Sequence, residues 1–227
     1  AYFETNGGLS SASGLDPSGF ILKWLVLGPY TGAGCGIGTT RLAADWLREA
    51  AGGVPETDLV WRAGQVVRTD YALAESDGLH PNAGTALPTV EDYASFSDTI
   101  NFNDSVWPPD PDSIMGYAFV YVDNVTTSPL AVDLACASDD AIVVLLNGVR
   151  IHTNDVCRGV GGAGEIQDRA AATLAVGKNL LVVKCFEQGG GWSFRVRFEE
   201  RGRGTAIASK SRIQVTTDPD AGLLFGG

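Results

Sequence analysis

Two adjacent aspartates, Asp139 and Asp140, are the residues best placed by type and spacing to do chemistry. They follow Ser138 between two apolar segments, where their charges repel each other unless a cation or backbone donors lie close. A calcium ion would satisfy both, because Ca²⁺ takes hard oxygen ligands and loop carbonyls can help. In the alternative, structural interpretation, one aspartate caps the turn and the other pairs with Arg150 or Arg158. Further oxygen ligands for an ion are available on Asn147, Asn154 and Asp155.

Aromatic rings offer a second route to a ligand, because a sugar stacks its C–H face on a ring. The candidate rings are those of Trp61, Tyr93, Trp107 and Trp192. Trp107 lies in a loop rich in proline and aspartate, so it is predicted to be the most exposed of them. The strand and helix faces that they occupy predict core positions for Trp24, Trp46 and Trp192.

The sequence gives little evidence for a catalytic site. The chain has two histidines, His80 and His152, and no Gly-x-Ser-x-Gly elbow, which disfavours a hydrolytic triad. Its 27 acidic residues do not single out a pair for glycoside cleavage. The glycine-rich stretches at residues 32–38 and 159–164 lack the lysine of a phosphate-binding loop and are predicted to be surface loops. We therefore expect a protein that is not an enzyme.

The composition favours strands joined by tight turns. Hydrophobic residues make up 44% of the chain and charged residues 19%, with 29 glycines, which argues against disorder and against a helical bundle. The net charge of −11 disfavours nucleic acid as a partner, because a phosphate backbone requires a basic surface. No apolar run approaches the roughly 20 residues of a membrane span.

Strand-length segments separated by turn residues dominate the second half of the chain. They are predicted at residues 117–123, 130–137, 141–146, 149–153, 171–175, 179–186, 192–199 and 212–216. Asn147-Gly148 between two apolar runs predicts a type I′ hairpin turn. In the segment 192–199 the apolar residues alternate with polar ones and are expected to face the core. The polar residues expected to face water are Ser193, Arg195, Arg197 and Glu199.

The first half of the chain is less regular. The apolar run at residues 20–27 predicts a buried strand, and a helix is predicted near residues 40–50. The residues that share one face of that helix are Leu42, Trp46, Leu47 and Ala50. Residues 51–112 are interpreted as long loops that hold short strands near Val60 and Val66.

Many short strands with few helices predict an all-β fold, an antiparallel β-sandwich or jelly roll with one short helix and long loops. The expected organisation is an N-terminal arm at residues 1–19, a single β-sandwich domain at residues 20–216 and a C-terminal tail at residues 217–227. Both ends carry apolar residues outside the predicted domain, which could contact a neighbouring copy of the chain.

Four cysteines, Cys35, Cys136, Cys157 and Cys185, form no CxxC pair, so structural disulfides are preferred over zinc binding. Disulfides imply an oxidising compartment, and the start at Ala1 without methionine is typical of a chain after signal-peptide cleavage. We expect a secreted or cell-surface protein. A bridge between two of the three later cysteines is expected, but four cysteines allow three complete pairings and the choice stays open.

The order of motifs in the second half resembles two related groups of secreted bacterial modules. Ser138-Asp139-Asp140, then Asn147-Gly148, then an aromatic strand after residues 189–191 resemble the protective-antigen-type β-sandwich and the galactose-binding-like jelly roll. The segment 23–30 (KWLVLGPY) and the later Asp-Trp-Leu and Gly-Gly are similar to the opening of such modules. The resemblance covers about residues 20–200. It implies that the adjacent aspartates hold a calcium ion that contacts a sugar, as they do in adhesins of the protective-antigen type.

Two functions follow from these observations. The first is a non-catalytic, secreted carbohydrate-binding module that binds a polysaccharide or cell-surface glycan near Asp139, Asp140 and the loop aromatics, with Ca²⁺ as a possible cofactor. The second is a self-assembling extracellular subunit of a fibre, pilus-like structure or coat, whose partners are copies of itself and whose terminal arms make the contacts.

Overall fold

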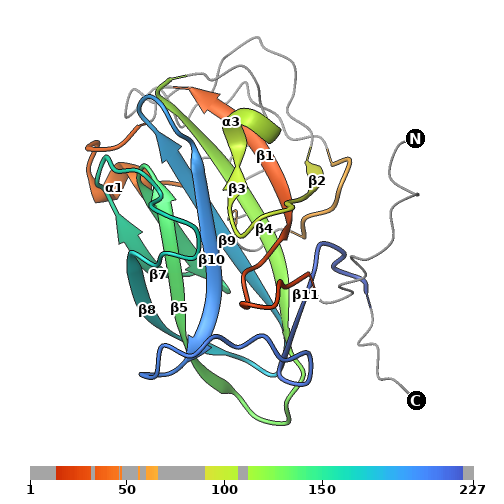
Figure 1. Ribbon diagram of the computed structural model, residues 1–227. Coiled ribbons are helices and arrows are strands. Elements are labelled where there is room, and N and C mark those ends of the chain that lie inside the picture. Colours follow the sequence, from red (N-terminus) through yellow and green to blue (C-terminus); the bar gives the residue numbers. More distant parts are fainter. Residues whose placement is uncertain are drawn as a thin grey trace.

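The computed structural model describes residues 14–31, 34–45, 47, 56, 60–65, 90–106 and 112–221, and its strands form two antiparallel sheets (Figure 1). The strands are β1 (Lys23–Thr31), β2 (Glu91–Ala94), β3 (Ile100–Asn101), β4 (Ile114–Asn124), β5 (Leu130–Asp139), β6 (Ile142–Leu146), β7 (Val149–Asn154), β8 (Asp168–Leu174), β9 (Gly177–Glu187), β10 (Ser193–Glu200) and β11 (Ile213–Thr216). The described helices are α1 (Thr39–Leu42) and α3 (Phe102–Ser105). The predicted all-β antiparallel sandwich is confirmed.

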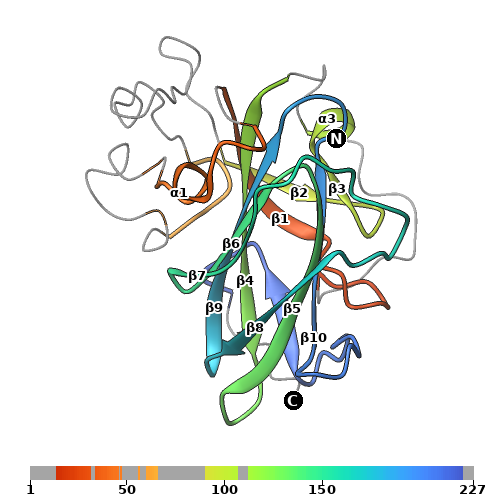
Figure 2. The same cartoon turned by 90° about the vertical axis from the view of Figure 1, so that its left-hand side faces the viewer.

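The two sheets differ in size. The larger, seven-stranded sheet has the order β2-β1-β4-β9-β6-β7, with β11 also paired to β4. The smaller, four-stranded sheet has the order β3-β10-β5-β8. Seen from the side in Figure 2, the sheets form two layers, and α1 lies on the outer side of the larger one.

The central strands of the larger sheet, such as β4 and β6, are buried on both faces, which explains their nearly continuous apolar sequences. Alternate residues of its strands, such as Trp24, Val120 and Val183, point into the inter-sheet core. Their neighbours pack into a second group on the far side, here called the outer cluster. The outer cluster comprises Leu25, Leu27, Tyr30, Cys35, Leu42, Leu47, Trp61, Val90, Met115, Tyr117, Phe119, Ala141, Val143, Leu145, Val182 and Phe186. All of β4 is therefore buried.

The alternation predicted along β10 is confirmed on one face and wrong on the other. Trp192, Phe194 and other apolar residues of this segment lie in the inter-sheet core. The opposite face does not meet water, because Arg195 is only 2% exposed and Glu199 is fully buried. The segment around residues 158–167 hydrogen-bonds across this face, and the guanidinium of Arg197 lies 5.0 Å from the centroid of the Phe20 ring. Periodicity identifies which side chains share a face but does not reveal what covers that face.

The hairpin predicted at Asn147-Gly148 is confirmed. It joins β6 and β7, and both residues have positive φ, 49° for Asn147 and 79° for Gly148. The hairpin fixes the pairing of Leu146 with Val149. It thereby fixes which residues of β7 lie beside the inter-sheet core.

The first half of the chain departs from the prediction in three places. The helix predicted near residues 40–50 is described only as α1, although Leu42 and Leu47 are buried as expected. Val60 lies outside any strand and is 50% exposed, while Val66, Trp46 and Ala50 fall outside the described residues. Leu15, expected in the N-terminal arm, is buried in the inter-sheet core.

The disulfide joins Cys35 to Cys157, with their Cα atoms 5.2 Å apart. The expectation of a bridge between two of the three later cysteines is therefore wrong. Cys136 of β5 and Cys185 of β9 are buried and free, and both lie in the inter-sheet core. Strand positions alone gave no sign that the loop carrying Cys35 returns to the loop after β7. No helix in the described part of the chain is long and apolar enough to span a membrane.

Candidate functional site

The paired aspartates lie at the C-terminal end of β5, a central strand of the smaller sheet. Asp139 is directly opposite Ser193 of β10, and residues directly opposite each other share a face of a sheet. Asp139 therefore belongs to the outer face of the smaller sheet, the face that the residue 158–167 segment crosses. Asp140 follows after a cis peptide bond and begins the turn into β6.

Asp140 has a structural role. One of its carboxylate oxygens accepts a hydrogen bond from the backbone N–H of Arg158 at 2.7 Å, and the other accepts one from the N–H of Gln188 at 2.9 Å. The side chain is buried, so these bonds compensate much of the cost of taking the carboxylate out of water. Asp140 thus ties together the loop after β7 and the loop after β9. This is the backbone-capping role of the structural interpretation.

Asp139 is different, because its carboxylate is half-buried between two glycine-rich loops. Gly191 approaches so closely that a Cβ at that position would collide with the Asp139 carboxylate, and a Cβ on Gly159 would lie 3.9 Å from it. Burial, together with the charge of Asp140, raises the pKa of Asp139 to about 6, although a backbone hydrogen bond from Val160 partly opposes the shift.

The cations near the pair do not neutralise it. The guanidinium of Arg158 contacts Asp168 and donates to the hydroxyl of Ser138 at 3.1 Å, so its charge points away from Asp139. Within the described ranges, no lysine or arginine side chain forms an ion pair with Asp139 or Asp140. The predicted pairing of the second aspartate with an arginine is therefore wrong on the described residues.

The additional calcium ligands suggested by the sequence are engaged elsewhere. Asp155 accepts hydrogen bonds from the N–H groups of Gly36 and Gly38 at 2.6 and 2.7 Å, beside the disulfide. The amide of Asn154 donates to Asp168 at 3.2 Å. Asn147 lies in the β6–β7 hairpin, where its amide oxygen accepts the N–H of Leu180. Any ion at Asp139 would thus draw its other oxygens from nearer loop carbonyls or water.

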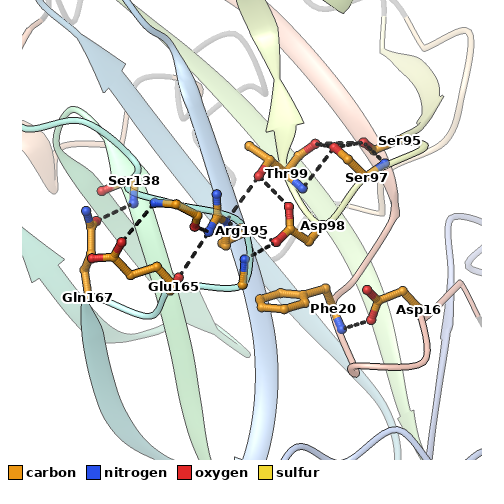
Figure 3. Close-up of polar contacts among 12 residues, drawn as sticks. Asp16, Phe20, Ser95, Ser97, Asp98, Thr99, Ser138, Glu165, Gln167 and Arg195 are labelled. Atoms are coloured by element: carbon orange, nitrogen blue, oxygen red, sulfur yellow. Dashed lines mark hydrogen bonds and ion pairs between the residues drawn. The ribbon is translucent and has the colours of Figure 1, made fainter.

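Arg195 anchors the segment that borders Asp139 (Figure 3). It donates to the carbonyls of Gly162 and Glu165 on that segment, and to the hydroxyl of Thr99 at 3.2 Å. Asp98 lies 3.8 Å from the guanidinium and accepts the N–H of Gly164. The loop at residues 95–99 and the glycine-rich segment are therefore held side by side over the smaller sheet.

The aromatic candidates have mixed outcomes. Trp61 is fully buried and stacks on Phe119 with ring centroids 4.2 Å apart, so its predicted role as a ligand platform is wrong. Tyr93 is partly buried and packs against the inter-sheet core. Trp192 is in that core, as predicted, and Trp107 lies outside the described residues.

The exposed ring that sequence reasoning missed is Phe96, which is 83% exposed. It belongs to the loop at residues 95–99, next to Asp98 and the glycine-rich segment. The sequence signal was that Phe96 stands alone among polar residues. Serines flank it on both sides, and the residue two positions further along the chain is Asp98. Such an isolated ring is not part of an alternating strand pattern.

A second cluster lies on the inner side of β5, where Cys136, His152 and Asp168 approach one another closely enough to suggest metal ligands. Burial alone would raise the pKa of Asp168, but hydrogen bonding and the charge of Arg158 outweigh burial and lower it. Burial also raises the pKa of the Cys136 thiol to about 12. We interpret this cluster as an ion-paired structural group, in which Asp168 already has its cation.

No family model matches this chain, and no curated protein matches it. Among solved structures, the chain is similar to the PA14 domain of the antifreeze protein MpAFP, at 13% sequence identity and a TM-score of 0.37. The alignment covers 85% of this chain and 89% of that domain. The β-sandwich itself is established by the two sheets, while membership of the protective-antigen or galactose-binding-like group stays a prediction.

Proposed function

We propose that this chain is a non-catalytic, extracellular carbohydrate-binding module that uses a calcium ion at Asp139. One observation carries the proposal: Asp139 is a half-buried carboxylate beside a second carboxylate, and its pKa is raised to about 6 by burial and by Asp140. A divalent cation relieves this repulsion and supplies coordination sites for hydroxyl groups of a sugar. The disulfide between Cys35 and Cys157 is compatible with an oxidising compartment.

Within this proposal, the neighbouring loops have separate roles. Asp140 holds the loops by its two backbone hydrogen bonds, and the glycines bring backbone close to the Asp139 carboxylate. Phe96 offers an exposed ring on the loop that is hydrogen-bonded to the glycine-rich segment. Aromatic stacking on a sugar ring complements coordination of its hydroxyls, because the two contacts use different faces of the sugar.

Calcium binding is tested first, by titration calorimetry and thermal melting in the presence and absence of a chelator. Calcium is expected to raise the melting temperature of the wild type and to leave Asp139→Asn unchanged. Asp92→Asn is the matched control, because Asp92 is exposed on β2 and its variant should respond as the wild type does. A wild-type melting temperature that saturating calcium does not move rules out the metal.

Sugar binding is tested on a glycan array, with and without calcium. Phe96→Ala is expected to weaken binding to any glycan that is retained by about tenfold, the loss typical of one exposed stacking contact, without changing the melting temperature. Val176→Ala, an exposed apolar residue at the turn before β9, serves as the control. An array without hits in either condition contradicts the proposed ligand class.

Self-assembly remains the second prediction from the sequence. The terminal segments that would make the contacts, residues 1–13 and 222–227, lie outside the described residues. Light scattering of the purified chain distinguishes the two functions. A binding module is expected to be monomeric at all concentrations, whereas a self-assembling subunit is expected to form polymers.

A further inference from the structure

A lysine is buried on the outer face of the larger sheet, among apolar and aromatic side chains. Lys184 lies in the middle of β9 and has no exposed surface, and its partner Glu56 is 3% exposed. Nζ of Lys184 is in direct contact with Oε1 of Glu56. Both groups border the outer cluster, so each has lost its hydration and faces the other.

The carboxyl group of Glu56 is held in one orientation. Its Oε2 accepts the hydroxyl hydrogen of Tyr117 at 2.6 Å, while Nζ of Lys184 also donates to the carbonyl of Ala44 at 2.6 Å. The backbone groups of Glu56 are engaged as well, because its N–H donates to Asp45 and its carbonyl accepts the indole N–H of Trp61. An amine and a carboxyl group are therefore presented to each other with little freedom to separate.

We propose that Lys184 and Glu56 condense in the folded protein to form an intramolecular isopeptide bond. The pair is the modification site, and the product is an amide that joins Lys184 of β9 covalently to Glu56. This inference is independent of the proposed sugar site, because Lys184 lies on the outer face of the other sheet.

The condensation balances without any other reactant. A proton passes from the ammonium of Lys184 to Oε1 of Glu56, and the neutral amine attacks Cδ. A second proton passes from nitrogen to Oε1, the Cδ–Oε1 bond breaks, and one water molecule leaves. Oε2 remains as the amide oxygen. The net change is one ammonium and one carboxylate converted into one amide and one water.

Burial makes the neutral form of Glu56 easier to reach than it is in water. Burial raises the pKa of Glu56 to about 7, although Lys184 opposes the shift. An apolar environment disfavours both charges, so transfer of the proton to give an amine and a carboxylic acid costs less there than in water. The Tyr117 hydroxyl donates to the oxygen on which negative charge develops during attack, as an oxyanion-stabilising donor does. Tyr117 is thereby assigned a catalytic role.

Mass spectrometry of the purified, denatured and unreduced wild-type chain tests the bond. The expected mass is that of the chain with its disulfide, less one water molecule. A proteolytic digest should contain one branched peptide that joins the Lys184 and Glu56 segments, and trypsin should not cleave after Lys184. A folded chain of unreduced mass that retains the water, and whose digest lacks the branched peptide, overturns the proposal.

Two variants separate this bond from other losses of water. Lys184→Arg retains a cation without a nucleophilic amine, so its mass should show no loss; a loss that persists in Lys184→Arg contradicts the assignment. Tyr117→Phe keeps the ring and removes the hydroxyl, so a chain recovered unfolded, before condensation, should on folding form the branched peptide about 100-fold more slowly than the wild type treated in the same way. A Tyr117→Phe chain that condenses at the wild-type rate overturns the role of Tyr117 but not the bond.

Discussion

The outer faces of the two sheets both bury charged side chains, and they satisfy these charges in different ways. On the larger sheet, Lys184 meets one carboxylate and one carbonyl beneath an apolar cover. On the smaller sheet, Arg195 meets two backbone carbonyls, a hydroxyl and a carboxylate that is 17% exposed. Lys184 thus has one charged partner, Glu56, whereas the hydrogen bonds of Arg195 are spread over several groups of the covering loops.

This difference predicts different consequences when a charge is removed. Loss of Lys184 leaves a carboxylate in an apolar environment without a compensating cation, and water cannot easily reach it. Loss of Arg195 leaves mainly backbone carbonyls and a partly exposed aspartate, which can recover some hydration if the loop loosens. Removing the charge from the larger sheet should therefore lower the global stability of the fold. Removing it from the smaller sheet should mainly loosen the residue 158–167 segment.

The largest effect is expected for Lys184→Met. It should lower the free energy of unfolding by about 3–5 kcal/mol, the range observed when one partner of a buried pair is removed, because Glu56 loses its partner whether the two side chains are ion-paired or joined by an amide. Urea unfolding followed by tryptophan fluorescence measures it. The double variant Lys184→Met, Glu56→Gln should recover part of the loss, because no unpaired charge remains; a single variant as stable as the wild type would contradict the contrast between the faces.

A smaller loss of about 2–3 kcal/mol is expected for Arg195→Met, because hydrogen bonds to several groups are lost but some of those groups regain water. Limited proteolysis should cut the residue 158–167 segment faster in this variant than in the wild type. The control is Arg169→Met, whose side chain is 49% exposed and whose partner Glu199 keeps its contact with Arg197. The control should change stability by about 0–1 kcal/mol and leave the cleavage rate unchanged.

The smallest effect concerns Asp139 and appears as a dependence on pH. Its pKa is raised from 3.8 to about 6 in the folded chain, so the folded state holds a proton that the unfolded state releases. Stability from this group is therefore greatest below about pH 4 and declines as the pH rises to about 6. In chelator at pH 7, Asp139→Asn should be more stable than the wild type by about 1 kcal/mol, a value reduced because the group is partly exposed.

Urea titrations of both chains between pH 4 and 7 measure this difference. The two curves should converge at the acid end and separate toward neutral pH. Added calcium should reverse the order at pH 7 if Asp139 binds the ion. Parallel curves across the whole range would show that Asp139 carries no repulsion in the folded chain.

The sequence alone determined much of the fold. The continuous apolar run at residues 20–27 identified a buried strand, and Asn147-Gly148 identified the hairpin between β6 and β7. Trp24 and Trp192 were correctly placed in the core. These features are local: side-chain periodicity and turn chemistry act over a few residues, so a single sequence displays them.

Only the tertiary structure decided what covers each sheet and what each buried charge meets. Alternation along β10 could not reveal that Arg195 lies beneath a loop, and cysteine spacing could not reveal that Cys35 reaches Cys157. The aspartate pair was visible in the sequence. The sequence did not reveal that Asp140 caps backbone N–H groups while Asp139 is half-buried with a raised pKa. These outcomes depend on contacts between segments far apart in the chain, whose closure depends on the packing of the whole sandwich rather than on local preference.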